Sequence, residues 1–197
     1  MAIGEWVLRE ACREAASWPR HLQIAVNLSP VQFRHGDLPG LVHTVLLETG
    51  LAADRLELEI TEGVLIGDFS RAVSILRRLK ALGVRIAMDD FGTGYSSLSY
   101  LQSFPFDKIK IDRAFISNLD RNMQSTAIVR AVIGLGHGLS LPVSAEGVET
   151  QEQMNLHVQE ACDEVQGFLF GRPQPIEAYA EMVGREPVPA REILLAG

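Results

Sequence analysis

The sequence has little of what several common kinds of functional site require. Only two of its 197 residues are cysteines, Cys12 and Cys162. Each lies in an apolar, helix-like pattern, so two reduced and packed thiols are expected rather than a disulfide or a metal site. None of the five histidines falls at the end of an expected strand. Histidine acid–base catalysis and nucleophilic triads are therefore without support.

The chain also has no net positive charge and no long hydrophobic run. The formal net charge is −7, which argues against a nucleic-acid surface that works by general charge attraction. No apolar run is long enough to span a bilayer, and no signal peptide is recognised. A cytoplasmic location is therefore expected, and a membrane-bound parent protein stays open. The chain does have a core, since 47% of its residues are hydrophobic and its length suits one domain.

The stretch over residues 88–98 is the most informative motif. An apolar run over residues 84–88 ends in two adjacent aspartates, Asp89 and Asp90, and a Gly-Thr-Gly turn follows at once. Two neighbouring carboxylates at the end of a buried strand repel each other and stay ionised only beside a cation. A pair of divalent metal ions usually supplies the positive charge beside such carboxylates. The alternative is an Asp-Asp pair that caps the next helix or forms a turn.

Expected strands alternate with expected helices along the chain. The pattern predicts six strands, near residues 24, 58, 86, 110, 144 and 165. It predicts helices over residues 3–18, 41–49, 69–82, 97–101, 125–139, 152–161 and 176–183. This alternation is typical of a parallel sheet covered by helices. Residues 1–184 are expected to form the domain, and residues 185–197 a linker-like tail.

Each expected strand ends in a polar or charged side chain. The residues are Asn27, Glu59 with Glu62, Asp89 with Asp90, Lys110 with Asp112, Glu146 with Glu149, and Gln166. The carboxyl ends of parallel strands lie on one side of the sheet, and in β/α barrels that side carries the active site. Six segments are therefore expected to deliver polar groups to one place.

The chemistry of this set is coherent. Carboxylates and an amide oxygen are hard ligands, suited to magnesium, manganese or calcium and less to zinc. Lys110 would stay protonated among so many acids and could orient a water molecule or neutralise developing charge. Two metal ions about 3.5–4 Å apart, with a bridging aspartate and a positioned water, describe the hydrolysis of a phosphate ester.

Other interpretations of single residues stay open. Asn27 could be a turn residue, and Gln166 could be a plain loop amide. Glu62 and Glu149 could each ligate a metal, or could hold a loop by accepting backbone N–H bonds. Glu57 and Lys108 lie lower on the same strands as Glu59 and Lys110, and are expected to be structural charge partners.

With these residues in view, the chain resembles the EAL domain family, the cyclic di-GMP phosphodiesterases of bacterial signalling. The resemblance covers about residues 3–183. Its carriers are the stretches 26–29 (VNLS), 56–62 (LELEITE), 89–98 (DDFGTGYSSL), 108–113 (KIKIDR), 145–150 (AEGVET) and 166–167 (QG), followed by Arg172-Pro173. It implies a TIM-like (β/α) barrel that hydrolyses one bond of cyclic di-GMP to give linear pGpG. Magnesium or manganese is the implied cofactor, and calcium commonly inhibits the family.

The resemblance also implies a role for each strand-end residue. Metal ligands are implied at Asn27, Glu59, Asp89, Asp90 and Glu146, with Asp89 as the bridging ligand. Lys110 matches the lysine that holds the attacking water, with Gln166 nearby. Glu62 matches the glutamate that anchors the loop after the aspartate pair, a loop linked to dimerisation and activation. Asp112 and Glu149 match positions near the substrate.

The chain departs from the family's pattern at its start. The Glu-Ala-Leu tripeptide, whose glutamate is a ligand of the first metal, is absent, and so is the substrate-contacting arginine that follows it. Six expected strands are two short of eight, so the expected fold is an incomplete barrel of this class. We expect a cyclic di-GMP phosphodiesterase whose printed chain alone has little activity. The alternative is a non-catalytic module that binds cyclic di-GMP or a protein. A homodimer of the complete domain, and a fused sensory or GGDEF domain upstream, are the implied partners.

Overall fold

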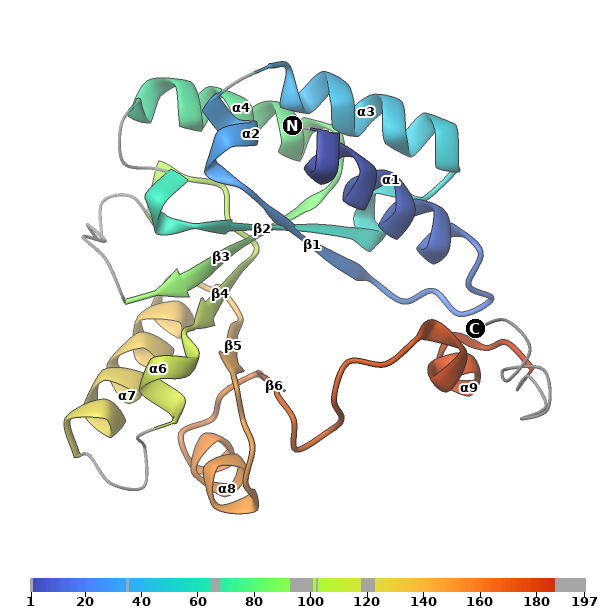
Figure 1. Ribbon diagram of the computed structural model, residues 1–197. Helices are drawn as coiled ribbons and strands as arrows, with labels where there is room; N and C mark the ends of the chain where they lie inside the picture. Colours follow the sequence, from blue (N-terminus) through green and yellow to red (C-terminus); the bar gives the residue numbers. More distant parts are fainter. Residues whose placement is uncertain are drawn as a thin grey trace.

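Six parallel strands form one curved sheet, and their order in the sheet is their order in the sequence (Figure 1). The strands are β1 (Ile24–Leu28), β2 (Leu56–Thr61), β3 (Arg85–Phe91), β4 (Lys108–Ile111), β5 (Val143–Glu146) and β6 (Glu164–Gln166). The computed structural model describes residues 2–34, 36–64, 68–92, 101, 103–117 and 123–186. All six expected strands are confirmed. Residues 97–100 of the expected helix over residues 97–101, and most of the expected tail, lie outside the described residues.

Helices connect the strands and cover the sheet. They are α1 (Ala2–Ala16), α2 (Pro30–Arg34), α3 (Leu38–Thr49), α4 (Phe69–Ala81), α6 (Arg113–Ile116), α7 (Met123–Gly138), α8 (Gln151–Gln159) and α9 (Ala180–Val183). Short 3-10 turns occur at η1 (Ala53–Arg55), η2 (Glu62–Val64) and η3 (Ile176–Tyr179). The expected helices near α1, α3, α4, α7 and α8 are confirmed. The last expected helix begins as η3 and continues as α9.

Each strand presents different chemistry to its two faces, as β2 shows. Leu56, Leu58 and Ile60 have no exposed surface and contribute to the apolar core on the helix side. Glu57 and Glu59 alternate with them and are also buried, at 4% and 5% exposure, on the concave side of the sheet. The concave side of the curved sheet is therefore lined by charged rather than apolar side chains, as a polar binding site requires.

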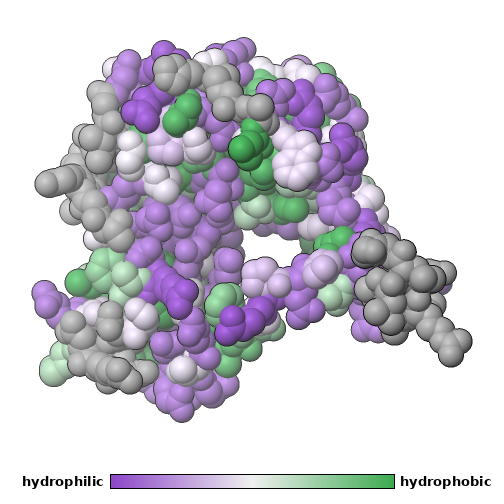
Figure 2. Space-filling model, in the orientation of Figure 1, coloured by the Kyte–Doolittle hydropathy of each residue, from purple (hydrophilic) through white to green (hydrophobic). Residues whose placement is uncertain are grey.

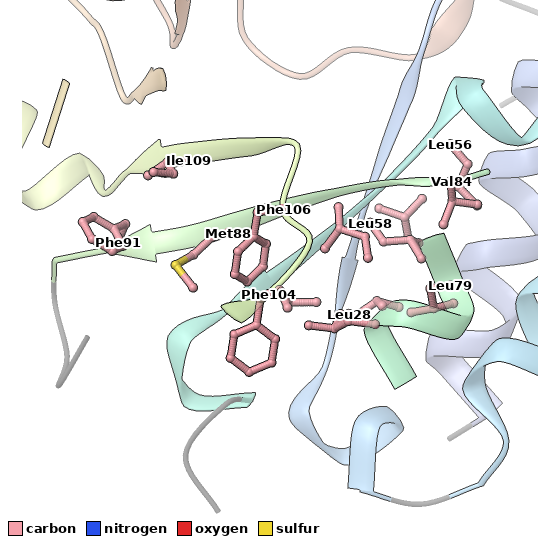
Figure 3. Close-up of a cluster of buried hydrophobic side chains, with 14 of the residues drawn as sticks. Leu28, Leu56, Leu58, Leu79, Val84, Met88, Phe91, Phe104, Phe106 and Ile109 are labelled. Carbon is pink, nitrogen blue, oxygen red and sulfur yellow. The ribbon is translucent and has the colours of Figure 1, made fainter. Parts of the chain in front are cut away.

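The hydrophobic core lies between the strands and the covering helices. Figure 3 shows Leu28 and Leu58 of neighbouring strands on the side of Leu79 of α4, and Met88 of β3 nearer to Phe106. Phe104 and Phe106, in the segment before β4, pack with their ring centroids 5.7 Å apart. This layer fixes the strands relative to one another and so positions the residues at their ends.

The C-terminal segment returns to the first helix. Arg185 forms an ion pair with Glu14 of α1 at 2.7 Å, and the N–H of Arg20 donates to the Val183 carbonyl at 3.1 Å. Figure 2 shows open space between this segment and the rest of the molecule. Within the described residues, β1 pairs only with β2 and β6 only with β5, so the barrel is open between them. In that same part of the chain, no helix is both long and apolar enough to cross a membrane.

Candidate functional site at the carboxyl edge of the sheet

The strand register brings the polar strand ends together. Asn27 of β1 lies beside Glu59 of β2, and Glu146 of β5 lies beside Gln166 of β6. Asn27 lies within a paired strand, so the interpretation of it as a turn residue is wrong. Because all pairings are parallel, these side chains occupy one edge of the sheet.

Asp89 and Asp90 lie at an irregularity in β3. Neighbouring residues on a regular strand point to opposite faces. Here the pairing with β4 shifts register between Met88 and Phe91, and Asp90 has a left-handed backbone with φ of 55°. Such a bulge re-aims a side chain, so both carboxylates reach the same side of the sheet. Both residues belong to β3 itself, which overturns the interpretation of the pair as a helix cap or a turn.

The two aspartates form a tight acidic cluster with Glu146. One oxygen from each of the three carboxylates lies within 4.8 Å of the other two. Burial, and then a hydrogen bond with Asp112, raise the pKa of Asp90 to about 6, and the neighbouring charges act in the same direction. Burial likewise raises the pKa of Glu146. Burial disfavours the charged form of these carboxylates, and a divalent cation bound beside them would compensate their charge.

Lys110 lies at the centre of the carboxylates. Its ammonium is 2.5 Å from Glu59 Oε1 and 3.7 Å from Asp89 Oδ1, and it also pairs with Glu146. Burial alone would lower the pKa of this lysine, but the contacts with Glu146 and Glu59 raise it above its ordinary value. Lys110 is therefore a fixed positive charge, 4% exposed, that contacts three carboxylates of the edge.

Three further candidate residues make contacts of other kinds. Glu62 accepts a hydrogen bond from the N–H of Gly92 at 2.9 Å and so holds the exit of β3. Asp112 caps α6 by accepting from the N–H of Ala114 at 2.7 Å. Glu149 forms an ion pair with Arg113 at 2.6 Å.

A second charged layer lies lower in the sheet. Lys108 pairs with Glu57 at 3.2 Å and with Glu164 at 2.8 Å, and Arg85 approaches Glu57 at 3.6 Å. The prediction that Glu57 and Lys108 are charge partners is confirmed. This layer is balanced in charge, unlike the carboxyl edge, where acids outnumber the single lysine.

The sequence did not single out Arg113, Gly147 or Phe168, although the structure places them around the same edge. Arg113 opens α6 and crosses the backbone of Gly147, and Phe168 follows the end of β6. Each lies one or two residues beyond a polar strand end, and Arg113 and Gly147 also fall within the stretches 108–113 and 145–150 that carry the resemblance.

A curved parallel β/α sheet whose carboxyl edge carries a carboxylate cluster around one buried lysine defines an incomplete TIM-like barrel with a site suited to divalent cations. The chain belongs to the EAL domain family, whose sequence pattern matches residues 1–173.

Several relatives share this domain. The chain is 63% identical over 177 residues to a signalling protein of Caulobacter vibrioides, covering 90% of this chain and 22% of the relative. It is 46% identical over 179 residues to the bifunctional diguanylate cyclase/cyclic di-GMP phosphodiesterase MucR of Pseudomonas aeruginosa, covering 89% of this chain and 26% of MucR. The chain thus spans about a quarter of the length of these relatives.

Solved structures agree with the fold. A complex of the MucR phosphodiesterase with c-di-GMP superposes with a TM-score of 0.87 at 46% identity, covering 90% of this chain and 73% of that one. A manganese/cy-diGMP complex of Klebsiella pneumoniae BlrP1 superposes with a TM-score of 0.80 at 35% identity, covering 87% of this chain and 44% of that one. The incomplete barrel expected from the sequence is confirmed.

Proposed function

We propose that this domain is a metal-dependent phosphodiesterase that hydrolyses one bond of cyclic di-GMP to give linear pGpG. The observation that carries the proposal is the carboxyl edge itself, where Asp89, Asp90 and Glu146 converge within 4.8 Å beside Lys110. Membership of the EAL family supports the choice of substrate, since MucR carries that activity in its name.

The residues of the edge fit a pair of divalent cations. The proposed ligands donate only oxygen: Asn27, Glu59, Asp89, Asp90 and Glu146. An oxygen-only set suits magnesium or manganese. Bound there, the ions would supply an activated water and would stabilise negative charge on the phosphate. We assign Asp89 as the bridging ligand, because it lies in β3 between Glu59 of β2 and the side of the sheet that carries Glu146.

The other residues of the edge hold the attacking water, anchor the exit of β3 or bind the substrate. Lys110 holds the attacking water through its ammonium, and Gln166, beside Glu146 in the register, assists it. Glu62 anchors the exit of β3 by accepting from the N–H of Gly92. Asp112 and Glu149 contribute to substrate binding from the ends of β4 and β5.

The domain bounds, location and partners that we propose follow from the resemblance to the EAL family. We assign residues 1–184 to the phosphodiesterase domain and residues 185–197 to a tail. We further propose a cytoplasmic location, a homodimer of the complete domain, and regulation by a fused sensory or GGDEF domain. A non-catalytic module that binds cyclic di-GMP is the second candidate, and it is favoured by the open barrel of the described residues.

The experiment that tests the proposal uses the full-length product of the gene. The purified protein is incubated with cyclic di-GMP in manganese, magnesium, calcium or a chelator, and pGpG is followed by chromatography. We expect pGpG with manganese and magnesium and none with calcium or the chelator. Binding of cyclic di-GMP without pGpG in any metal would favour the second candidate, and a different product would contradict the proposed reaction.

A further inference from the structure

The amino edge of the sheet, opposite the proposed site, carries a contact that the hydrolysis described above does not use. Asp107 directly precedes β4, and its backbone N–H donates to the Ile86 carbonyl of β3 at 2.8 Å. The carboxylate of Asp107 accepts from the N–H of the same Ile86 at 2.7 Å. Both backbone polar groups of Ile86 are therefore hydrogen-bonded to one aspartate.

Lys80 of α4 completes this contact. Its ammonium lies 2.7 Å from Asp107 Oδ1 and 2.8 Å from Oδ2, and it also donates to the Val84 carbonyl at 3.3 Å. The side chains of Lys80 and Asp107 are 30% and 24% exposed, so water screens the pair only in part. The helix thus holds the carboxylate against β3, and we call Lys80, Asp107 and Ile86 the amino-edge clamp.

The same arrangement occurs again two strands further on. Asp163 directly precedes β6, its N–H donates to the Val143 carbonyl at 3.2 Å, and its carboxylate accepts from the N–H of Val143 at 2.8 Å. A side-chain nitrogen from the helix before β5 is again in contact, since His137 Nε2 of α7 lies 3.1 Å from Asp163 Oδ2. Val143 pairs with Ile109, so β4 lies between the two clamped residues.

The strand β4 needs such a clamp because its own pairing with β3 is short. It has four residues, and its register with β3 shifts between Met88 and Phe91. Residues two apart on a strand point to the same face, so a slip of β4 by two residues would exchange Lys108 for Lys110. The apolar side chains would keep their face in such a slip. Alternation alone therefore does not specify which lysine reaches the carboxyl edge.

The position of Lys110 along β4 matters to the site. Its ammonium lies 2.5 Å from Glu59 Oε1 and 3.7 Å from Asp89 Oδ1, whereas Lys108 pairs with Glu57 in the lower layer. A displacement of a reacting group by about 1 Å can cost about 10²-fold in rate. Whatever fixes the start of β4 therefore also fixes a group on which the reaction depends.

We propose that Asp107, held by Lys80, is a positioning residue of the hydrolytic site: it fixes the register of β4 and thereby the place of the Lys110 ammonium among the carboxylates. The inference rests on the proposed function and adds to it a residue at the opposite edge of the sheet. Asp107 acts through the backbone of β4 and through Lys110. Its loss therefore slows the chemical step and leaves the binding of cyclic di-GMP unchanged.

The test is a double-variant cycle in the full-length protein. Asp107→Ala, Lys110→Ala and the combination of the two are assayed for kcat and KM with cyclic di-GMP and manganese. Asp107→Asn is the conservative variant, because its amide oxygen can still accept from the Ile86 N–H. Asp37→Ala is the control, because Asp37 pairs with Arg78 of the same helix at 3.0 Å and its side chain is 61% exposed. Circular dichroism and urea unfolding show whether each variant is folded in the assay.

We expect Asp107→Ala to lower kcat about 10- to 100-fold with KM almost unchanged. In the Lys110→Ala background the same change should lower kcat by less than about twofold, because the group that Asp107 positions is already gone. Asp107→Asn loses only the ion pair with Lys80 and should keep kcat within about fivefold of the wild type. Asp37→Ala should match the wild type.

The outcomes separate this inference from the proposed function. A wild-type kcat in folded Asp107→Ala, or a loss of equal size with and without Lys110, would overturn the inference while the function stands. If Asp107→Ala does not fold, Lys80→Met tests the same clamp and should lower kcat about two- to fivefold, but not in the Lys110→Ala background. An unchanged kcat in Lys80→Met would then overturn the inference. A wild-type protein that forms no pGpG would refute the proposed function, and the inference with it.

Discussion

At the scale of single residues, the site depends on a balance of charge around Lys110. One buried ammonium contacts Glu59, Asp89 and Glu146, so the carboxylates still carry an excess of negative charge. Burial, and to a lesser degree the neighbouring carboxylates, raise the pKa of Asp90 and of Glu146. A lysine so placed remains protonated and can act as an electrostatic group without being a metal ligand.

Replacing Lys110 tests that role. Lys110→Ala should lower kcat by about 10²–10³, the scale of losing one preorganised electrostatic group, and should leave KM almost unchanged. The measurement is steady-state hydrolysis of cyclic di-GMP by the full-length protein. A large rise in KM with unchanged kcat would instead make Lys110 an anchor of the substrate.

His157 of α8 makes a prediction about pH. Its ring has no exposed surface, and neither ring nitrogen has a hydrogen-bond partner within the described residues. Burial lowers the pKa of His157 below its ordinary value of 6.5. As the pH falls below 6.5, the unfolded chain takes up a proton that the folded chain resists. The resulting loss of stability is at most about 1.4 kcal/mol per pH unit.

His157→Leu should therefore flatten the acid side of the stability profile. The measurement is urea unfolding of the full-length protein at pH 7.5, 6.5 and 5.5. The wild type should lose more stability between pH 6.5 and 5.5 than the variant does. His43→Leu is the control, because His43 is exposed on α3, and it should keep the wild-type slope. If all three proteins lost the same stability between pH 6.5 and 5.5, His157 would not be the source of the acid sensitivity.

At the scale of elements, irregular backbone rather than regular structure shapes the site. The strand β3 carries its two aspartates to one side only because Asp90 adopts a left-handed conformation. The exit of β5 turns at Gly147, with φ of 72°, directly under Arg113. Each irregularity directs a functional side chain and costs backbone energy that the neighbouring sheet offsets.

Gly147→Ala should reveal that cost. The added Cβ requires a left-handed alanine and meets Arg113, so the free energy of unfolding should fall by about 1–3 kcal/mol. Gly134→Ala is the matched control, because Gly134 lies in α7 with open space around it. There alanine should stabilise the protein by about 0.5–1 kcal/mol. Urea unfolding measures both variants, and a stable Gly147→Ala protein would contradict the strained turn.

The sequence predicted regular elements well and irregular ones poorly. Alternation revealed β2, because Glu57 and Glu59 face the interior between buried leucines. The helix α2 was not predicted, because five residues are too few to show a helical period, although Pro30 is well placed in its first turn. The four-residue α6 is too short to show periodicity. Neither the bulge at Asp90 nor the contact of Arg113 with Gly147 could be predicted, since both depend on strands distant in sequence.

At the scale of the whole molecule, the described residues form an open barrel. Among the described residues, the strands β1 and β6 each have one unpaired edge. The C-terminal segment crosses from β6 to α1, where Arg185 pairs with Glu14. An exposed strand edge invites pairing with another chain. The site lies inside this open sheet, so its geometry depends on how the edges are covered.

A polypeptide of residues 1–197 alone should therefore associate and should hydrolyse cyclic di-GMP negligibly. Light scattering over a range of concentrations measures the association, and chromatography measures pGpG. Ala25→Lys places a charge at an exposed position of the edge strand β1 and should reduce the association. A monomer with robust turnover would show that the open edges do not matter.

The central claim is that the carboxyl edge of this sheet is a metal-dependent hydrolytic site with Asp89 at its centre. The most direct measurement is pGpG formation from cyclic di-GMP and manganese by the full-length protein carrying Asp89→Asn. The change removes a charge without adding bulk, so turnover should be abolished while the unfolding midpoint stays close to that of the wild type. Asp54→Asn, the same change at an exposed aspartate, should keep full activity. Near-normal hydrolysis by Asp89→Asn would contradict the account.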